Sequence, residues 1–139
     1  ASAGHRAQAR VEGGSMILVD TSVWVDHLRR RDAAVARELE AGTVLAHPFV
    51  VGEIACGLLP RRAETLSMLA ELPLAVVAGH AEALVFIERH EFAGRGIGYV
   101  DMHLLASAAL PPGALLWTRD KRLAAAAREL RLAHEPKGD

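Results

Sequence analysis

Four carboxylates interrupt apolar surroundings at corresponding places in the sequence. Asp20 follows MILV, Asp120 follows LLWTR, and Glu53 and Asp101 lie near the starts of two predicted helices. Carboxylates that converge within several Å repel one another strongly unless they are protonated or neutralised by cations. No paired cysteine or histidine spacing lies nearby, and oxygen-only ligands match Mg²⁺ or Mn²⁺ rather than structural zinc. The residue types therefore predict an acidic divalent-cation site, provided that the fold brings the four together.

The elements that must position these acids are short buried strands separated by helices. Apolar runs predict strands at 16–19, 43–46, 74–77 and 114–117, with a short terminal strand near 132. Helices are expected from 21–22 to 29–31 and at about 33–40, 49–59, 61–72, 81–92, 100–110 and 121–130. This alternation is typical of an α/β domain with a mostly parallel central sheet. All four acids then fall at the carboxyl edge of the strands, where open parallel sheets bind ligands.

Each acid taken alone also has a structural interpretation, because helix N-termini favour acidic residues through capping and the helix dipole. The hydroxyls of Thr21, Ser22 and Thr118 lie beside the acids, where they either cap helices or orient the carboxylates and metal-bound water. The basic residues next to Asp120 are candidate contacts for the phosphates of a substrate, namely Arg119, Lys121 and Arg122. Trp24 and Trp117 are predicted to be core residues, and Cys56 a small buried one.

Length and composition indicate one domain. The chain has 139 residues, of which 51% are hydrophobic and 24% charged, and it has one cysteine. Residues 1–15 are small, polar and aperiodic, so we expect them to be an added leader or a disordered tail, and residues 16–139 to form a single domain. No apolar run reaches the length of a membrane span. The net charge is −1, or −2 without Arg6, Arg10 and Glu12, which excludes the global basic field of proteins that coat nucleic acid.

Four sequence blocks in order resemble one known family: MILVDTSVW, GEIACGLL, YVDMHLLASA and LLWTRDKRL. They look like the PIN-domain ribonucleases and, within them, the VapC toxins of bacterial type II toxin–antitoxin pairs. The resemblance implies a three-layer α/β/α PIN-like domain over 16–139. It also implies that Asp20, Glu53, Asp101 and Asp120 form an acidic metal site for Mg²⁺ or Mn²⁺, supported by Thr118.

The same resemblance implies an activity, partners and a location. The activity is metal-dependent endonucleolytic cleavage of single-stranded or loop RNA, such as tRNA or rRNA, with 5′-phosphate products and inhibition of translation. The implied partners are a cognate VapB-type antitoxin and a second copy of the chain, in a homodimer that forms a heterotetramer or larger complex with antitoxin. The implied location is the cytoplasm, which a single cysteine also fits.

Other protein classes place an aspartate after a strand or share this fold. A haloacid-dehalogenase-like phosphatase needs a second aspartate two residues after the first, where this chain has Ser22. A receiver domain needs a phosphoacceptor aspartate after a middle strand, which is absent from the sequence, and phosphate-loop and serine-hydrolase motifs are absent too. The serious alternative is a catalytically idle PIN scaffold that only binds RNA or protein. The sequence leaves open whether Glu53 is a ligand or a base, and whether one or two metal ions bind.

Overall fold

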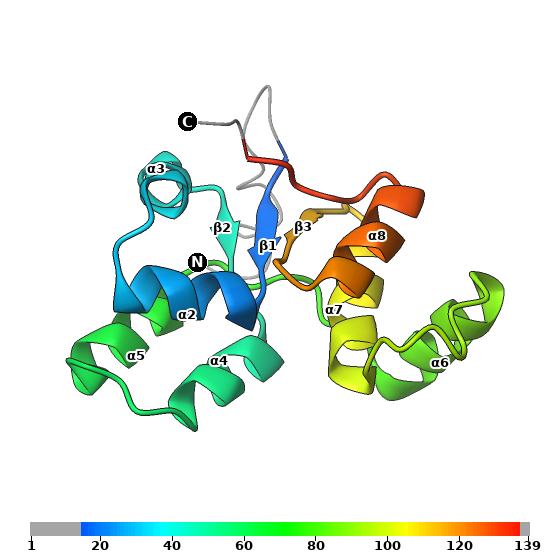
Figure 1. The fold of residues 1–139 in the computed structure, drawn as a ribbon, viewed down its shortest axis with the longest axis horizontal. Coiled ribbons are helices and arrows are strands. Elements are labelled where there is room, and N and C mark those ends of the chain that lie inside the picture. Colours follow the sequence, from blue (N-terminus) through cyan, green and yellow to red (C-terminus); the bar gives the residue numbers. More distant parts are fainter. Residues whose placement is uncertain (1–14, 137–139) are drawn as a thin grey trace.

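The structure is a computed structural model that describes residues 15–136. In chain order its elements are β1 (Ile17–Val19), α2 (Thr21–Arg29), α3 (Ala33–Ala41), β2 (Val44–Leu45), α4 (Pro48–Ala55), α5 (Arg62–Glu71), α6 (His80–Arg89), α7 (Tyr99–Ala109), β3 (Leu115–Trp117) and α8 (Lys121–Glu129). Figure 1 shows α2–α5 on one side of the strands and α6–α8 on the other. The predicted α/β class with a parallel sheet between helices is therefore confirmed.

The sheet has three parallel strands in the order β2-β1-β3. Ile17 and Leu18 pair with Val44 and Leu45 on one side, and Ile17 to Val19 pair with Leu115 to Trp117 on the other. All three residues of β1 are buried, as expected of a uniformly apolar central strand. Single parallel bridges extend the sheet at both edges, from Ala46 to Leu74 and from Leu116 to Ala133. The strands predicted at 74–77 and near 132 are thus reduced to one pairing each.

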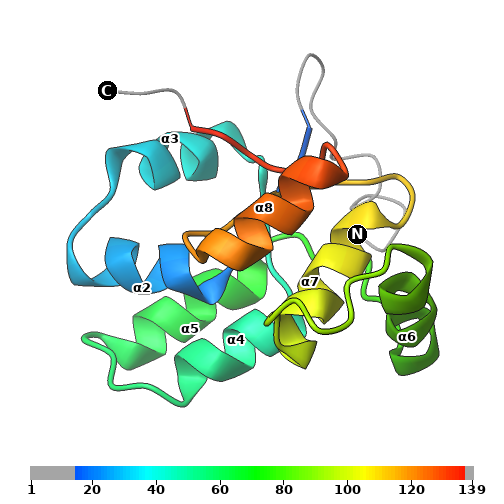
Figure 2. The ribbon, with the colours of Figure 1, turned by 45° about the vertical axis from the view of Figure 1, so that its right-hand side comes forward.

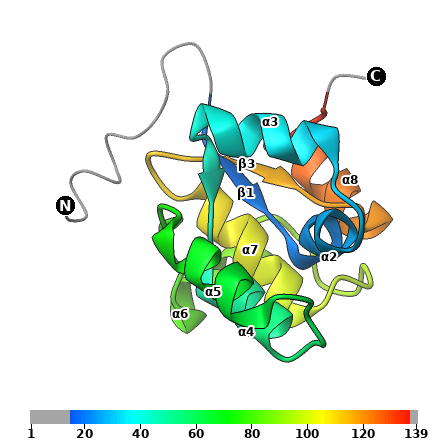
Figure 3. The same cartoon turned by 90° about the vertical axis from the view of Figure 1, so that its left-hand side faces the viewer.

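The two helical layers pack on opposite faces of the sheet. Figure 3 views the molecule from the side of α2–α5, with the strands behind them. Figure 2 shows α7 flanked by α6 and α8. Trp24 and Trp117 are 0% and 2% exposed, so the prediction that both belong to the core is confirmed. No helix in the part of the chain that the structure describes is long and apolar enough to cross a membrane.

Helix boundaries follow local signals, with two corrections. Gly42 ends α3 with φ 75°, a left-handed conformation that glycine adopts without steric cost, and Pro48 lies in the first turn of α4. The N-cap of α2 is Asp20, whereas Thr21 and Ser22 were the expected caps. The helix expected over 49–59 ends at Ala55, so Cys56 lies beyond it and is exposed rather than buried. The leader expected at 1–15 falls almost entirely outside the described residues.

Candidate active site

The four acids lie on elements of both helical layers, at the carboxyl edge of the sheet. Asp20 follows β1 directly and is the N-cap of α2, while Glu53 lies in α4. Asp101 lies in the first turn of α7, and Asp120 is the N-cap of α8. The N–H of Asp20 donates to the carbonyl of Trp117 at 3.0 Å, which aligns the end of β1 with the end of β3. Asp20 and Asp120 thus leave adjacent strands at the same level of the sheet.

The negative charges of the neighbouring acids act on Asp101 and Asp20. Burial, followed by the negative charges of Asp20, Asp120 and Glu53, raises the pKa of Asp101 from 3.8 to about 6. Burial also raises the pKa of Asp20, the most enclosed of the four at 5% exposure, and the charge of Glu53 adds to that shift. The negative charges of the other three acids thus disfavour ionisation of Asp101, and that of Glu53 disfavours ionisation of Asp20.

Three hydroxyl side chains contact these carboxylates. The Thr21 hydroxyl donates to Glu53 Oε1 at 2.5 Å. Thr118 accepts a hydrogen bond from the N–H of Asp120 at 3.1 Å, and its hydrogen bond to Asp20 opposes the rise in the pKa of that residue. Ser22 contributes mainly through its backbone, because its N–H donates to Asp20 Oδ1 at 2.5 Å. All three residues lie where the sequence placed them, beside the acids.

The arrangement fits a divalent cation in charge and ligand type. Within residues 15–136, no group of three or more His, Cys, Asp or Glu side chains is gathered closely enough to hold a metal ion by itself. The carboxylates are instead engaged locally, Asp120 Oδ1 with the N–H of Leu123 at 2.9 Å and Glu53 with Thr21. Mg²⁺ commonly keeps several waters and takes only one or two carboxylates directly. Asp20 is buried and Asp101 half-buried, whereas Glu53 and Asp120 are exposed, and such a partly open set of acids suits a partly hydrated ion.

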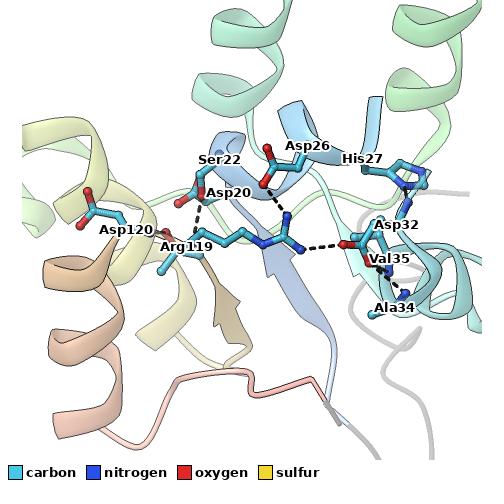
Figure 4. A network of polar contacts seen from close by, with 10 residues as sticks. Asp20, Ser22, Asp26, His27, Asp32, Ala34, Val35, Arg119 and Asp120 are labelled. Carbon is cyan, nitrogen blue, oxygen red and sulfur yellow. Dashed lines mark hydrogen bonds and ion pairs between the residues drawn. The ribbon is translucent and has the colours of Figure 1, made fainter. Parts of the chain in front are cut away.

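The three basic residues beside Asp120 have different environments. The Arg119 guanidinium donates to Asp26 Oδ2 at 2.6 Å and to Asp32 Oδ2 at 2.7 Å (Figure 4). Arg122 reaches across to the carbonyl of Gly96 at 3.5 Å, and a Cβ at Gly96 would lie 2.5 Å from its Nη1. Lys121 is exposed, and it has no ion-pair partner in the part of the chain that the structure describes. Of the three expected phosphate contacts, Arg119 is thus paired with two acids, and Arg122 packs against Gly96 with one long contact to a neutral carbonyl.

A buried hydrogen-bond network joins the helix of Glu53 to the helix of Asp101, which sequence reasoning did not foresee. His47, the N-cap of α4, accepts from the N–H of Phe49 through Nδ1 at 3.1 Å, so its proton is on Nε2, which donates to Ser107 at 3.1 Å. The Ser107 hydroxyl donates to the carbonyl of His103 and accepts from the N–H of Ala78. Burial lowers the pKa of His47 to about 4, so the ring is neutral. The sequence signal that could have indicated His47 as a helix N-cap is its place directly before Pro48, a proline at the first helical position.

Comparison with known proteins identifies the family. A family model described as "PIN domain" matches residues 17–129 of the chain. The chain belongs to the PIN-domain family. Two curated relatives, from Mycobacterium tuberculosis strains CDC 1551 / Oshkosh and ATCC 25618 / H37Rv, are both named Ribonuclease VapC32. Each is 48% identical to this PIN domain over 114 residues, which cover 82% of the chain and 92% of the relative. The resemblance to VapC-type ribonuclease toxins is thus confirmed over most of the chain.

The raised pKa of Asp101 should lower the stability of the metal-free protein at neutral pH. Asp101 binds its proton more tightly in the folded chain than in the unfolded one, so its contribution to folding worsens as the pH rises from about 4 to about 6 and stays unfavourable above that range. Asp101→Asn should therefore raise the free energy of unfolding at pH 7.5 by about 1–2 kcal/mol, a value discounted for partial exposure. Thermal melting in EDTA measures this gain, which should vanish near pH 3.5.

Added Mn²⁺ should instead stabilise the wild-type protein more than the Asp101→Asn variant. At about a hundred times its dissociation constant, an ion that binds only the folded wild-type protein adds roughly 2.7 kcal/mol, and Asp101→Asn should lose most of that increment. Glu88→Gln removes an exposed acid of α6 and is the matched control, because it should change neither quantity. A variant at Asp101 that melts below wild type without metal and gains as much from Mn²⁺ would contradict a shared acidic site.

Proposed function

We propose that this PIN domain is a metal-dependent endoribonuclease toxin that cleaves single-stranded or loop RNA, with tRNA and rRNA as its target classes, and thereby inhibits translation. The observation that supports the proposal is that Asp20, Asp120 and Glu53, from separate parts of the sequence, lie near enough to Asp101 for their negative charges to raise its pKa. The likeness to relatives named ribonucleases supports the choice of RNA as substrate.

In this proposal Asp20, Asp101 and Asp120 hold Mg²⁺ or Mn²⁺. When bound, such an ion lowers the pKa of a water molecule and offsets negative charge on the scissile phosphate. Glu53 has two candidate roles, as a ligand through water or as the base that accepts a proton from the attacking water. Thr21 fixes Oε1 of Glu53 in either role, which leaves Oε2 available. The Thr118 hydroxyl lies between Asp20 and Asp120 and holds both in place.

The mechanism predicts the chemistry of the products. Because a water molecule attacks phosphorus rather than the ribose 2′-hydroxyl, cleavage should leave a 5′-phosphate and a 3′-hydroxyl and should stop in EDTA. Asp20→Asn, Asp101→Asn and Asp120→Asn should each lower the rate by orders of magnitude while the protein remains folded. The measurement is end-group analysis of cleaved RNA with Mn²⁺ or EDTA. Cyclic phosphate ends that form in EDTA would exclude the mechanism, and a folded protein that binds no Mn²⁺ would favour the idle scaffold.

Lys121 is the proposed phosphate contact among the three basic residues, because Arg119 is paired with two acids and the Arg122 guanidinium is directed to the carbonyl of Gly96. Lys121→Gln should raise KM for RNA several-fold with little change in kcat. The slope of log affinity against log salt should fall by about 0.7, the value for one phosphate contact on a single strand. Arg128→Gln, the same charge change at the far end of α8, is the control. An unchanged salt dependence in Lys121→Gln would remove this residue from the RNA contacts.

The proposed partners are a VapB-type antitoxin and a second copy of the chain, acting together in the cytoplasm as a heterotetramer or larger complex. The likeness to VapC-type relatives supports both partners. For the second copy, the candidate surface is the open groove between α6 and α7, which has a volume of about 510 Å³ and has Val85 and Phe86 among its apolar lining residues. Val85 is 54% exposed, which is unfavourable for an apolar side chain facing water.

The charges on this groove are self-complementary. Glu82 and Arg89 line it two helical turns apart on α6, one on each side of Val85 and Phe86. A twofold axis near Val85 would place Glu82 of each copy against Arg89 of the other, as an isologous interface requires. Neither residue has an ion-pair partner in the described part of the chain, and Glu82 uses Oε1 to accept from the N–H of Gly79 at 2.7 Å.

This pairing predicts how charge reversals change the dimer. Glu82→Arg and Arg89→Glu should each be monomeric at concentrations where wild type is a dimer, because like charges then face each other. An equimolar mixture of the two variants should restore a dimer, since every contact then joins an arginine to a glutamate. Sedimentation of each variant and of the mixture measures this, with Glu88→Arg as the control. Dimers in both single variants would show that the copies meet elsewhere.

A further inference from the structure

The three residues 118–120, which connect β3 to α8, contact the acidic site on both sides of Arg119. Thr118 holds Asp20 and the N–H of Asp120, as described above, and Asp120 caps α8. The backbone N–H of Arg119 donates to Ser22 Oγ at 3.0 Å, and the N–H of the same serine donates to Asp20. Any displacement of this connection would therefore move two of the four carboxylates relative to each other.

The Arg119 side chain anchors this connection to the opposite helical layer. It extends away from Asp120 and ends between Asp26 of α2 and Asp32, the N-cap of α3 (Figure 4). Asp32 is itself fixed, because its Oδ1 accepts from the N–H groups of Ala34 and Val35 at 2.9 and 3.1 Å. The guanidinium thus joins a strand–helix connection on one side of the sheet to two helices on the other.

We propose that Arg119 is a positioning residue of the acidic site: through Asp26 and Asp32 it fixes the 118–120 connection, and thereby sets where Asp120 and Thr118 stand relative to Asp20. This inference rests on the proposed nuclease function for its catalytic consequence. Its structural part, the anchoring of Asp120, does not depend on that function.

The local charge argues against the competing role of Arg119 as an RNA contact. One guanidinium lies between two carboxylates, so the group carries a net charge of −1 and repels rather than attracts a phosphate. To reach RNA, the side chain would have to leave both acids. Its hydrogen bonds with Asp32 and Asp26 also raise the pKa of Arg119 above the usual arginine value, against the effect of burial, so the charge is fixed.

The anchor acts through geometry more than through stability. Its ion pairs are partly exposed, with 36% exposure at Arg119 and 53% at Asp26, and exposed pairs of this kind contribute little to folding. A displacement of about 1 Å in a catalytic group can nevertheless cost about a hundredfold in rate. Arg119→Gln should therefore lower kcat about ten- to a hundredfold and weaken Mn²⁺ binding, with KM for RNA and the melting temperature little changed.

Hydrogen exchange tests the anchoring in the metal-free protein, independently of any activity. The N–H of Asp120 donates to Thr118 and that of Leu123 donates to Asp120, so both report whether the connection stays in place. In Arg119→Gln these two amides should exchange faster, by about tenfold, while amides of β1 keep the wild-type rate. Arg128→Gln breaks another exposed arginine pair, to Glu135 at 3.6 Å, and should leave all of them unchanged. Unchanged exchange at Asp120 and Leu123 in Arg119→Gln would overturn the inference.

Kinetics of a matched set of variants then test the catalytic consequence. Asp26→Asn combined with Asp32→Asn keeps the shapes and the N-cap but removes both acceptor charges, so it should reproduce the loss in kcat seen with Arg119→Gln. Adding Arg119→Gln to that pair should cause little further loss, whereas Arg119→Lys should retain part of the rate. A raised KM in Arg119→Gln, with normal kinetics when Asp26 and Asp32 are replaced, would make Arg119 an RNA contact instead. A wild-type chain that neither binds Mn²⁺ nor cleaves RNA would contradict the proposed function and leave the exchange result standing.

Discussion

Repulsion among four carboxylates at one edge of a small sheet is the constraint that the surrounding structure has to offset. Asp20 is almost enclosed, and the other three charges reach Asp101 through a partly buried space. In such surroundings like charges interact more strongly than in water, so one carboxylate resists ionisation. The unfolded chain has no comparable penalty, because its acids are solvated and far apart. The acidic cluster therefore destabilises the native state at neutral pH, and other interactions must hold its members in place.

Helix N-termini provide part of the compensation. Asp20 and Asp120 are N-caps, and Asp101 lies in the first turn of its helix, so three of the four acids are next to the positive end of a helix dipole. The capping contact from the N–H of Ser22 further favours the ionised form of Asp20, and the N–H of Leu123 caps Asp120 in the same way. The structural interpretation of these acids and the functional one are thus compatible. The same N–H groups that make an aspartate a good cap also help to keep it charged beside other carboxylates.

The parts of this arrangement that depend on neighbouring residues could be predicted from the sequence, and those that depend on distant pairs could not. A buried apolar strand followed by an aspartate predicted Asp20 at the sheet edge, and the same signal predicted Asp120. Arg119 was expected to contact phosphate because it lies next to Asp120, and its ion pairs could not be foreseen because Asp26 and Asp32 are 93 and 87 positions away in the chain. Cys56 was expected to be buried because the predicted helix continued past Ala55. The helix in fact ends at Ala55, and Cys56 is exposed. His47 and Ser107 meet across 60 positions with no pattern that links them.

Two restraints, placed on different sides of the site, define its geometry. The His47–Ser107 hydrogen bond joins α4 to α7, and the Arg119 ion pairs join the β3–α8 connection to α2 and α3. Each restraint crosses from the layer that carries Asp20 and Glu53 to the layer that carries Asp101 and Asp120. The acids themselves push the same two layers apart. A divalent cation between them would convert that repulsion into a further cross-link, so metal binding and the packing of the two layers should stabilise each other.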